Sequence, residues 1–314
     1  MRHRVRRRWR EWERIGASGQ VLNWIRHGVR VKFKQGLRPK PFNHGISMLD
    51  ATPAQLEFLN SELPRFEACG AWERADNPRY VSRMFLVPKP GCNQWRLIID
   101  LRELNRYCST FTMTCETLKH LRHLSRPGDY FVSLDLADGY YTLGIREEDR
   151  DFFTVNYRGT LWRLACLPMG WSGSAYYFCK LTQVFTNHLR PPPQPVPTAT
   201  SPHSRRPTKR FLRNARGGGI RLLPYMDDFL FLADSYEDAL LLRQRVQALL
   251  DSLGLERNPK KGVWTPTQVG DHLGLTVDLH HGMFRAPPAK LQQLAQHASS
   301  LLGRAASNAR WLPT

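Results

Sequence analysis

Hydrophobic positions alternate along this chain in short runs that predict strands, and these runs are separated by stretches with helical spacing. One helix is predicted from Pro53 to just before Gly70, because Thr52 is a suitable N-cap and Pro53 suits the first helical position. Further helices are predicted at about 174–189, 236–255 and 287–302. Strands are predicted at 80–88, 95–100, 130–136, 152–157, 160–164, 220–225 and 229–232, with a further short pair in 263–264 and 272–278.

Residues 191–218 break this pattern. They are rich in Pro, Thr, Ser, Gly and Arg and carry no apolar period. Such a segment cannot pack a core, so we expect a flexible surface insertion between the helix that ends near Arg190 and the strand that starts at Ile220.

Two adjacent carboxylates, Asp227 and Asp228, lie where two of the predicted strands meet in a hairpin. A solvated hairpin tip would tolerate both charges, but such tips usually carry Gly or Asn. The flanking residues are nearly all apolar, and burying two like charges is costly without a counter-charge. A divalent cation is the simplest counter-charge.

Other candidate residues lie on neighbouring elements. Asp135 ends the strongly apolar strand 130–136. Lys89 and Arg96 lie on the hairpin 80–100, where they either grip a phosphate chain or are ordinary surface charges. A Gly/Ser-rich loop, residues 167–175, opens the next helix, and a helix start behind small residues can approach a nucleotide closely.

The charge of the chain narrows its partners. Its 314 residues carry 46 Lys and Arg against 27 Asp and Glu, a net charge of +19, and the pI is about 10.2. A polyanion, most simply nucleic acid, is the expected partner. The basic start, residues 1–14, is a nuclear-localisation patch, a nucleic-acid-binding arm or a solvated terminus. No apolar run reaches membrane-spanning length, and the six scattered cysteines contain no CxxC pair, so we expect ordinary buried thiols.

The order of these elements resembles that of the reverse transcriptases over roughly residues 80–280, and most closely the DIRS-type (tyrosine-recombinase) retroelements. The phrases that carry the likeness are WRLIIDLRELN, LPMGWSGSA, YMDD and Leu273-Gly274. The resemblance implies an α+β fold, a right-hand polymerase with fingers, palm and partial thumb and an antiparallel palm sheet backed by helices. The expected divisions are a basic extension (1–40), fingers and palm (41–283) and the start of a truncated thumb (284–314).

The resemblance also assigns roles to the acidic residues. Asp135, Asp227 and Asp228, with the backbone carbonyl of Leu136, would hold two Mg²⁺ ions, and Mn²⁺ could replace them. Mg²⁺ prefers hard oxygen ligands together with substrate phosphates, which three carboxylates provide.

A second group of residues would hold the incoming dNTP. Lys89 and Arg96 match residues that bind the triphosphate, and Asp138 and Gly139 would lie beneath it. Tyr140 matches the steric gate that excludes a 2′-hydroxyl; without the neighbouring motif it would be interpreted as a core tyrosine. The loop residues Met169 and Gly170 complete this group, and Met169 stands where many retroviral enzymes carry Gln.

Three further matches concern the chemistry, the primer and the structure of the fingers. Lys261, or less closely Lys260, matches a general acid for the leaving pyrophosphate. Leu273 and Gly274 resemble the primer-grip hairpin. The fingers residues that match in a structural role are Asp100, Arg102 and Asn105.

The resulting hypothesis is an RNA-directed DNA polymerase that extends a primer on an RNA or DNA template with dNTPs. The alternative is a nucleic-acid-binding relic without catalysis, favoured by the short thumb and by the lack of an RNase H acid constellation. Under either hypothesis we expect the chain to be a polyprotein fragment, a truncated element copy or a predicted open reading frame, because no RNase H, protease or recombinase signature is found. We expect a location in the nucleus or cytoplasm and no membrane partner, and the sequence leaves the oligomeric state open.

Overall fold

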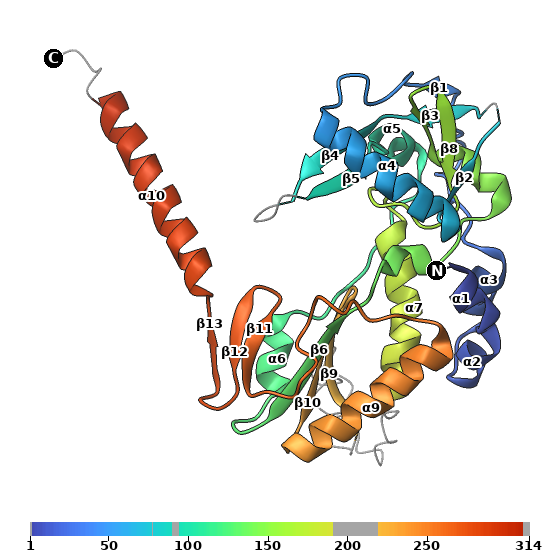
Figure 1. The fold of residues 1–314 in the computed structure, drawn as a ribbon. Coiled ribbons are helices and arrows are strands. Elements are labelled where there is room, and N and C mark those ends of the chain that lie inside the picture. The colour runs from blue at the N-terminus through green and yellow to red at the C-terminus, as the bar shows by residue number, and fades with distance from the viewer. Residues whose placement is uncertain (1, 77, 90–93, 191–218, 310–314) are drawn as a thin grey trace.

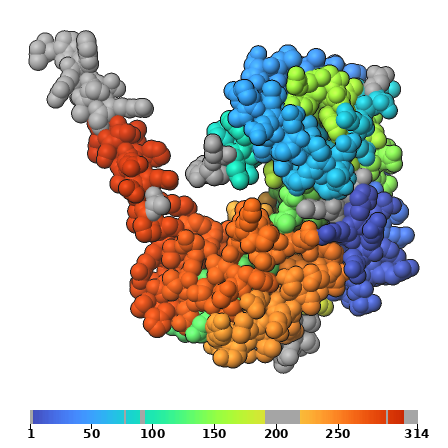
Figure 2. Space-filling view, in the orientation of Figure 1, coloured from blue at the N-terminus to red at the C-terminus, as the bar shows by residue number. Residues whose placement is uncertain are grey.

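The computed structural model describes residues 2–76, 78–89, 94–190 and 219–309. Figure 1 shows an upper and a lower lobe, with three short N-terminal helices beside the lower one and a long helix, α10 (Pro288–Ala309), projecting away from both. The space-filling view shows an open hollow between the two lobes and this projecting arm (Figure 2). The predicted insertion at 191–218 lies outside the described residues.

The lower lobe is built on an antiparallel sheet in the order β6, β10, β9, which are Tyr130–Asp135, Asp228–Ala233 and Arg221–Tyr225. The register pairs Asp228 with Asp135 across β10 and β6, and with Tyr225 across β10 and β9. The hairpin predicted around the paired aspartates is therefore confirmed, and its neighbour is the strand that ends on Asp135.

Both faces of this sheet are buried, which explains its near-continuous apolar sequence. One face, with Val132, Leu134, Phe229 and Phe231, belongs to the main core. That face is backed by α7 (Ser174–Leu189) and α9 (Tyr236–Leu253), and the rings of Phe185 and Phe229 meet at 5.3 Å. The other face packs against α6 (Leu118–Leu124) and residues 277–279 in a second, smaller core cluster.

Residues 258–263 run beside β6 at its free edge. Ser133 and Val263 are joined by two hydrogen bonds, Ser133 N to Val263 O at 2.7 Å and Val263 N to Ser133 Oγ at 2.8 Å. Gly262 makes this approach possible, because its φ is +77° and an added Cβ would lie 2.5 Å from the Ser133 carbonyl oxygen. A small sheet of β11 (Val269–His272), β12 (Leu275–Asp278) and β13 (Met283–Arg285) follows.

The upper lobe contains a mixed sheet and a separate hairpin. The sheet has the order β1 (Phe42–Asn43), β3 (Tyr80–Ser82), β7 (Thr154–Tyr157), β8 (Thr160–Leu164) and β2 (Trp72–Arg74). The hairpin is β4 (Met84–Pro88) with β5 (Trp95–Ile99). The helical segments of this region are α4 (Pro53–Ala68), α5 (Arg102–Tyr107) and the 3₁₀ helices η1 (Gly139–Thr142) and η2 (Glu147–Phe153).

The basic N-terminus folds into α1 (Arg2–Arg7), α2 (Trp9–Arg14) and α3 (Gly19–His27). These helices do not form a solvated terminus, because Val5 and Trp12 are fully buried. The Trp12 indole N–H donates to the carbonyl of Leu253 at 3.0 Å, and α1 lies against η1. From Arg4 onward the arginines of these helices are exposed, so the segment is basic on its surface and packed on its inner side.

Most predicted elements are confirmed with small changes in their ends. The helix at Pro53 has the expected Thr52 cap, which Gln55 completes as a capping box. The prediction of a strand at 263–264 was wrong: Val263 bonds to Ser133 of β6, but residues 263–264 form no strand, and the paired strands are β11 and β12. The tip of the hairpin predicted at 80–100, residues 90–93, lies outside the described residues.

Candidate active site

Three aspartates meet at one end of the lower sheet, although 92 residues separate Asp135 from Asp227 (227 − 135). Asp135 and Asp228 are directly opposite each other on antiparallel strands, so their Cβ atoms are separated by about 4.5–5.5 Å. Asp227 lies in the connecting turn, and its carbonyl accepts a hydrogen bond from Leu136 N at 2.9 Å. The fold thus brings together the acids that the sequence analysis singled out.

The turn between β9 and β10 contains only Met226 and Asp227, because Tyr225 and Asp228 already pair. Met226 has a φ of +58° while Asp227 does not have a positive φ, which is the pattern of a type II′ turn. Glycine is the usual residue at that first position. A methionine there costs about 1–3 kcal/mol of backbone strain, and such strain is typical of functional sites.

The carboxylates carry excess negative charge in a poorly hydrated place. Burial, with Asp227 and Asp135 nearby, raises the pKa of Asp228 to about 6. Burial is also the main cause that raises the pKa of Asp227, and Asp135 adds to it. The charged form of both residues is therefore less favourable than in a free aspartate, and a nearby cation would stabilise it.

Lys261 provides one such cation. Its Nζ donates to Asp135 Oδ2 at 2.9 Å, and this bond raises the pKa of the ammonium group, which stays protonated at neutral pH. The segment that carries Lys261 is held by Asn258, whose N–H donates to the carbonyl of Asp135 at 2.8 Å. The sequence analysis did not single out Asn258, since its contact depends on the position of β6.

The donor set suits a divalent cation, because three hard carboxylates share one lysine and two of them have raised pKa values. Among the described residues, no three His, Cys, Asp or Glu side chains already form a group that could hold a metal ion. Lys261 takes up one carboxylate oxygen of Asp135 instead. The conclusion that the three aspartates could hold a divalent cation therefore depends on the chemistry of their carboxylates and on how close they lie.

The segment after Asp135 contains the residues expected beneath a nucleotide. Asp138 adopts the left-handed region with φ of +48°, and Arg65 of α4 holds its carboxylate at 3.1 Å. The ring of Tyr140 lies against Phe178 of α7 at 5.3 Å. Gly139 permits that contact, since a Cβ there would meet the Phe178 ring at 2.7 Å. Arg65 could not be found from the sequence, because α4 is 73 residues away.

Tyr140 packs against the main core and also lies near the carboxylates. Burial, followed by Cys179 and Asp227, raises the pKa of its hydroxyl to about 12. The tyrosine is therefore a neutral, half-buried ring close to the aspartates.

The remaining predicted residues lie on other elements. Arg96 is exposed on β5, opposite Val87 of β4, and Lys89 follows β4 with its N–H bonded to the carbonyl of Gln94 at 2.8 Å. Leu273 and Gly274 form the turn between β11 and β12, with φ values of +47° and +74°, the pattern of a type I′ turn.

The loop with Met169 and Gly170 is tied to α5. Asn105 Nδ2 donates to the carbonyl of Gly170 at 2.8 Å, and Ser172 N donates to Asn105 Oδ1 at 2.9 Å. This supports the structural role expected for Asn105. Met169 is 52% exposed, so its side chain is presented to solvent at this loop.

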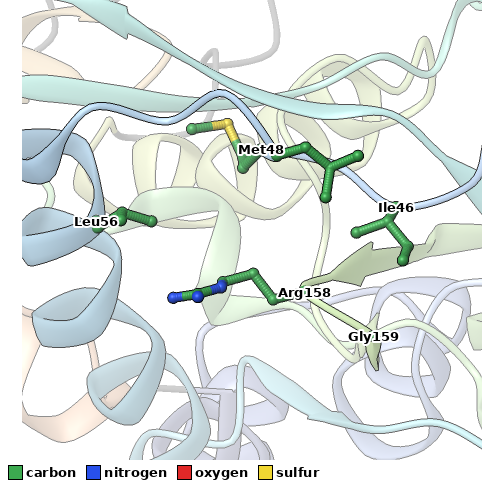
Figure 3. A pocket seen from close by; sticks show the side chains of 6 residues that line it. Ile46, Met48, Leu56, Arg158 and Gly159 are labelled. Atoms are coloured by element: carbon green, nitrogen blue, oxygen red, sulfur yellow. The ribbon is translucent and has the colours of Figure 1, made fainter.

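A separate pocket of about 350 Å³ lies in the upper lobe, away from the carboxylates. Its lining is mostly apolar, and Figure 3 shows the Arg158 side chain reaching into it between Met48 and Leu56. None of the predicted site residues lines it.

Comparison with known proteins decides the family. The family model described as "Reverse transcriptase (RNA-dependent DNA polymerase)" matches residues 87–277, more than half of the chain. The chain belongs to the reverse transcriptase family. The match includes the three aspartates, Lys261 and Tyr140.

Solved structures of foamy viral protease-reverse transcriptases share the fold of this reverse transcriptase chain. The structure with dsDNA has a TM-score of 0.63 at 16% identity, covering 88% of this chain and 52% of the viral one. The structure with an RNA/DNA hybrid has a TM-score of 0.61 at 17% identity, covering 87% and 33%. A dRH form with dsDNA gives 0.58 at 18%, covering 77% and 36%. The chain thus spans between a third and about half of these viral chains.

The right-hand polymerase fold expected from the sequence is confirmed by these matches, with its mixture of helices and antiparallel palm strands. In the part of the chain that the structure describes, no helix of this reverse transcriptase is long and apolar enough to cross a bilayer.

Proposed function

We propose that this chain is an RNA-directed DNA polymerase of a retroelement, which joins a dNTP to the 3′-hydroxyl of a primer on an RNA or DNA template. The observation that carries the proposal is the cross-strand pairing of Asp135 with Asp228, beside Asp227. Membership of the family supports the reaction, and the viral relatives were solved with dsDNA and with an RNA/DNA hybrid. The open hollow between the lobes and α10 is where the duplex would be held (Figure 2).

Reverse transcriptases generally use divalent metal ions. We propose that Asp135, Asp227, Asp228 and the Leu136 carbonyl hold two Mg²⁺ ions, for which Mn²⁺ can substitute. Ions bound there would stabilise negative charge on the attacking 3′-oxygen and on the leaving pyrophosphate. The raised pKa values of Asp227 and Asp228 support this role, because both groups gain from a nearby cation.

The nucleotide would lie between the lobes. Lys89 and Arg96 are proposed to bind its triphosphate from the β4–β5 hairpin, with the backbone at Asp138 and Gly139 beneath it. Tyr140 is proposed as the steric gate against a 2′-hydroxyl, and its fixed ring on Phe178 supports that role. Met169 and Gly170 would line the same site.

Lys261 is proposed to donate a proton to the leaving pyrophosphate. Its raised pKa supports a side chain that is protonated before the reaction. The Leu273-Gly274 turn is proposed to hold the primer strand, and α10 would begin a thumb.

We further propose the DIRS-type retroelements as the source group, because Gly219-Ile220-Arg221 precedes the YMDD sequence and Pro266-Thr267-Gln268 follows it. We also propose the division into an extension (1–40), fingers and palm (41–283) and the start of a thumb (284–314), and a location in the nucleus or cytoplasm.

Primer extension on poly(rA)/oligo(dT) with Mg²⁺ tests the function. Asp227→Asn should lower incorporation at least about 100-fold, which corresponds to about 2.7 kcal/mol of transition-state stabilisation. The matched control is Asp251→Asn, an exposed aspartate on α9 whose carboxylate bonds only Gln247 among the described residues. Its activity should equal that of the wild type.

A wild-type chain no more active than Asp227→Asn would contradict polymerase activity. If such a chain still bound a hybrid in a salt-sensitive way, the result would select the non-catalytic relic.

A further inference from the structure

Three sulfur atoms from separate parts of the chain meet beside the hairpin that carries the paired aspartates. Cys115 precedes α6, Cys179 lies on α7, and Met226 is in the β9–β10 turn. The Met226 Sδ atom is 3.5 Å from Cys179 Sγ and 4.0 Å from Cys115 Sγ. The Cys115 side chain also lies close enough to Cys179 to help raise the pKa of its thiol, after burial as the main cause. The three sulfurs therefore mark the corners of a triangle.

The size of this triangle suits a single metal ion. Metal–sulfur bonds are about 2.3 Å long, so an ion in trigonal coordination needs sulfurs that are about 4.0 Å apart. The separations of 3.5 and 4.0 Å come within about half an ångström of that value without any backbone movement. A disulfide would instead require the two Sγ atoms to approach to about 2.05 Å.

Access and ligand chemistry narrow the choice of ion. Cys115 and Cys179 are only half-buried, so the expectation of ordinary buried thiols was wrong for both. Thiolate and thioether ligands together select soft ions, and Cu(I) is the one that accepts both. Zn²⁺ favours four ligands from Cys, His and carboxylates, and Met is not among them. No His, Cys, Asp or Glu trio of the described residues provides such a set.

We propose that Cys115, Cys179 and Met226 form a binding site for one Cu(I) ion next to the catalytic carboxylates. Binding forms three Cu–S bonds, and each thiol releases its proton to solvent. The ion undergoes no change of oxidation state.

Occupancy would fix the turn that carries Asp227. Met226 is adjacent to Asp227 in the chain, and Cys179 lies on α7 next to Phe178, whose ring supports Tyr140. A bound ion would thus join the turn and α7 through their side chains. The expected loss of nucleotide incorporation rests on the proposed function, whereas the binding itself does not.

Titration of the full chain with Cu(I) tests the binding. The measurement is competition with a coloured Cu(I) chelator under anaerobic, reducing conditions, together with the ultraviolet thiolate-to-Cu(I) absorbance. We expect one tightly bound equivalent that Cys115→Ser/Cys179→Ser removes. Cys69→Ser is the matched control, because Cys69 is a half-buried cysteine at the end of α4 and should leave this equivalent in place.

Met226→Leu provides a second variant that keeps the size of the side chain. It should weaken Cu(I) binding by about tenfold or more while retaining both thiols. A double cysteine variant that binds Cu(I) like the wild type would overturn the proposal, as would unchanged binding by Met226→Leu. Zn²⁺ bound as tightly as Cu(I) would overturn the choice of ion.

Primer extension with and without one equivalent of Cu(I) tests the consequence. Cu(I) should lower incorporation by the wild type several-fold but leave the double cysteine variant at its own metal-free rate. Wild-type incorporation that is unchanged with the site filled would overturn the coupling. A chain that binds Cu(I) but never incorporates nucleotides contradicts the proposed polymerase alone.

Discussion

Asp135 and Asp228 occupy a position that is unfavourable for two acids, since like charges directly opposite on antiparallel strands repel. Burial is the main cause that raises the pKa of Asp228, and the charges of Asp227 and then Asp135 add to it. The neighbouring turn adds strain, because Met226 has a positive φ, and Leu273 repeats this in the turn of β11 and β12. Stability is given up at the two hairpin turns to which we assign chemistry and primer binding.

His272 is a second residue whose position lowers the stability of the fold. It is 6% exposed, and its Nε2 has no hydrogen-bond partner within the described part of the chain. Burial lowers the pKa of this histidine to about 4. The unfolded chain therefore binds a proton below about pH 6.5 that the folded chain does not bind until about pH 4.

We predict that stability falls as the pH is lowered from 6.5 to 4, by about 3 kcal/mol for this residue. His272→Phe should remove that part of the pH dependence, and His280→Gln, an exposed neighbour, should retain it. Urea denaturation at several pH values measures the difference. Parallel pH profiles for wild type and His272→Phe would contradict the assignment.

At the scale of elements, β9 is fixed at its start by a buried ion pair. Arg221 Nη1 lies 2.5 Å from Asp129 Oδ2, and the two side chains are 6% and 3% exposed. The same guanidinium donates to the carbonyl of Leu124 at 3.0 Å. This contact holds β9 against the end of α6, and β9 in turn carries the turn with Asp227.

Arg221→Ala should destabilise the fold by about 3–5 kcal/mol, because Asp129 would be left buried without a counter-charge. Arg126→Ala is the control, since its ion pair with Asp234 is exposed and 3.5 Å long, and such pairs contribute about 0–1 kcal/mol. Urea denaturation at pH 7 compares the two. Equal losses would show that burial of the Arg221 pair contributes nothing.

Local pattern was enough to predict the hairpin at the aspartates, the Thr52 helix and the strand that ends on Asp135, because apolar alternation and caps are local signals. The packed N-terminal helices were not predicted. Their sequence is dominated by arginine, and only the distant partner of Trp12 shows that one face is buried. The edge contact of residues 258–263 was missed for the same reason, since it depends on the position of Ser133.

The triangle of Cys115, Cys179 and Met226 shows the same limit at the site itself. Cys115 precedes Met226 by 111 positions, and Cys179 precedes it by 47. Metal motifs are recognised by close spacing, and no spacing rule covers three sulfurs from three elements.

At the scale of the whole molecule, both the net charge and the shape favour binding of a nucleic-acid duplex. The net charge of +19 belongs to a chain whose two lobes and projecting α10 surround an open hollow (Figure 2). A nucleic-acid duplex held there would meet cationic side chains, and its binding would release counterions from the phosphates.

We predict that binding of a labelled RNA/DNA hybrid weakens by about 10³-fold between 50 and 200 mM salt, as expected for about six phosphate contacts. Fluorescence anisotropy across that range measures the slope. Asp251→Asn should show the same slope, because its carboxylate is on the outer face of α9. Affinity that does not change with salt would contradict electrostatic binding of the backbone.

The contact between Trp12 and Leu253 has a consequence for biosynthesis. The ribosome completes α2 some 241 residues before its partner exists, so the indole stays uncovered for most of translation. The nascent chain cannot complete its N-terminal helices until the lower lobe has been made, and holding chaperones have that interval in which to bind the exposed tryptophan. The packing of Trp12 is therefore completed late, although α2 precedes the lower lobe in the chain.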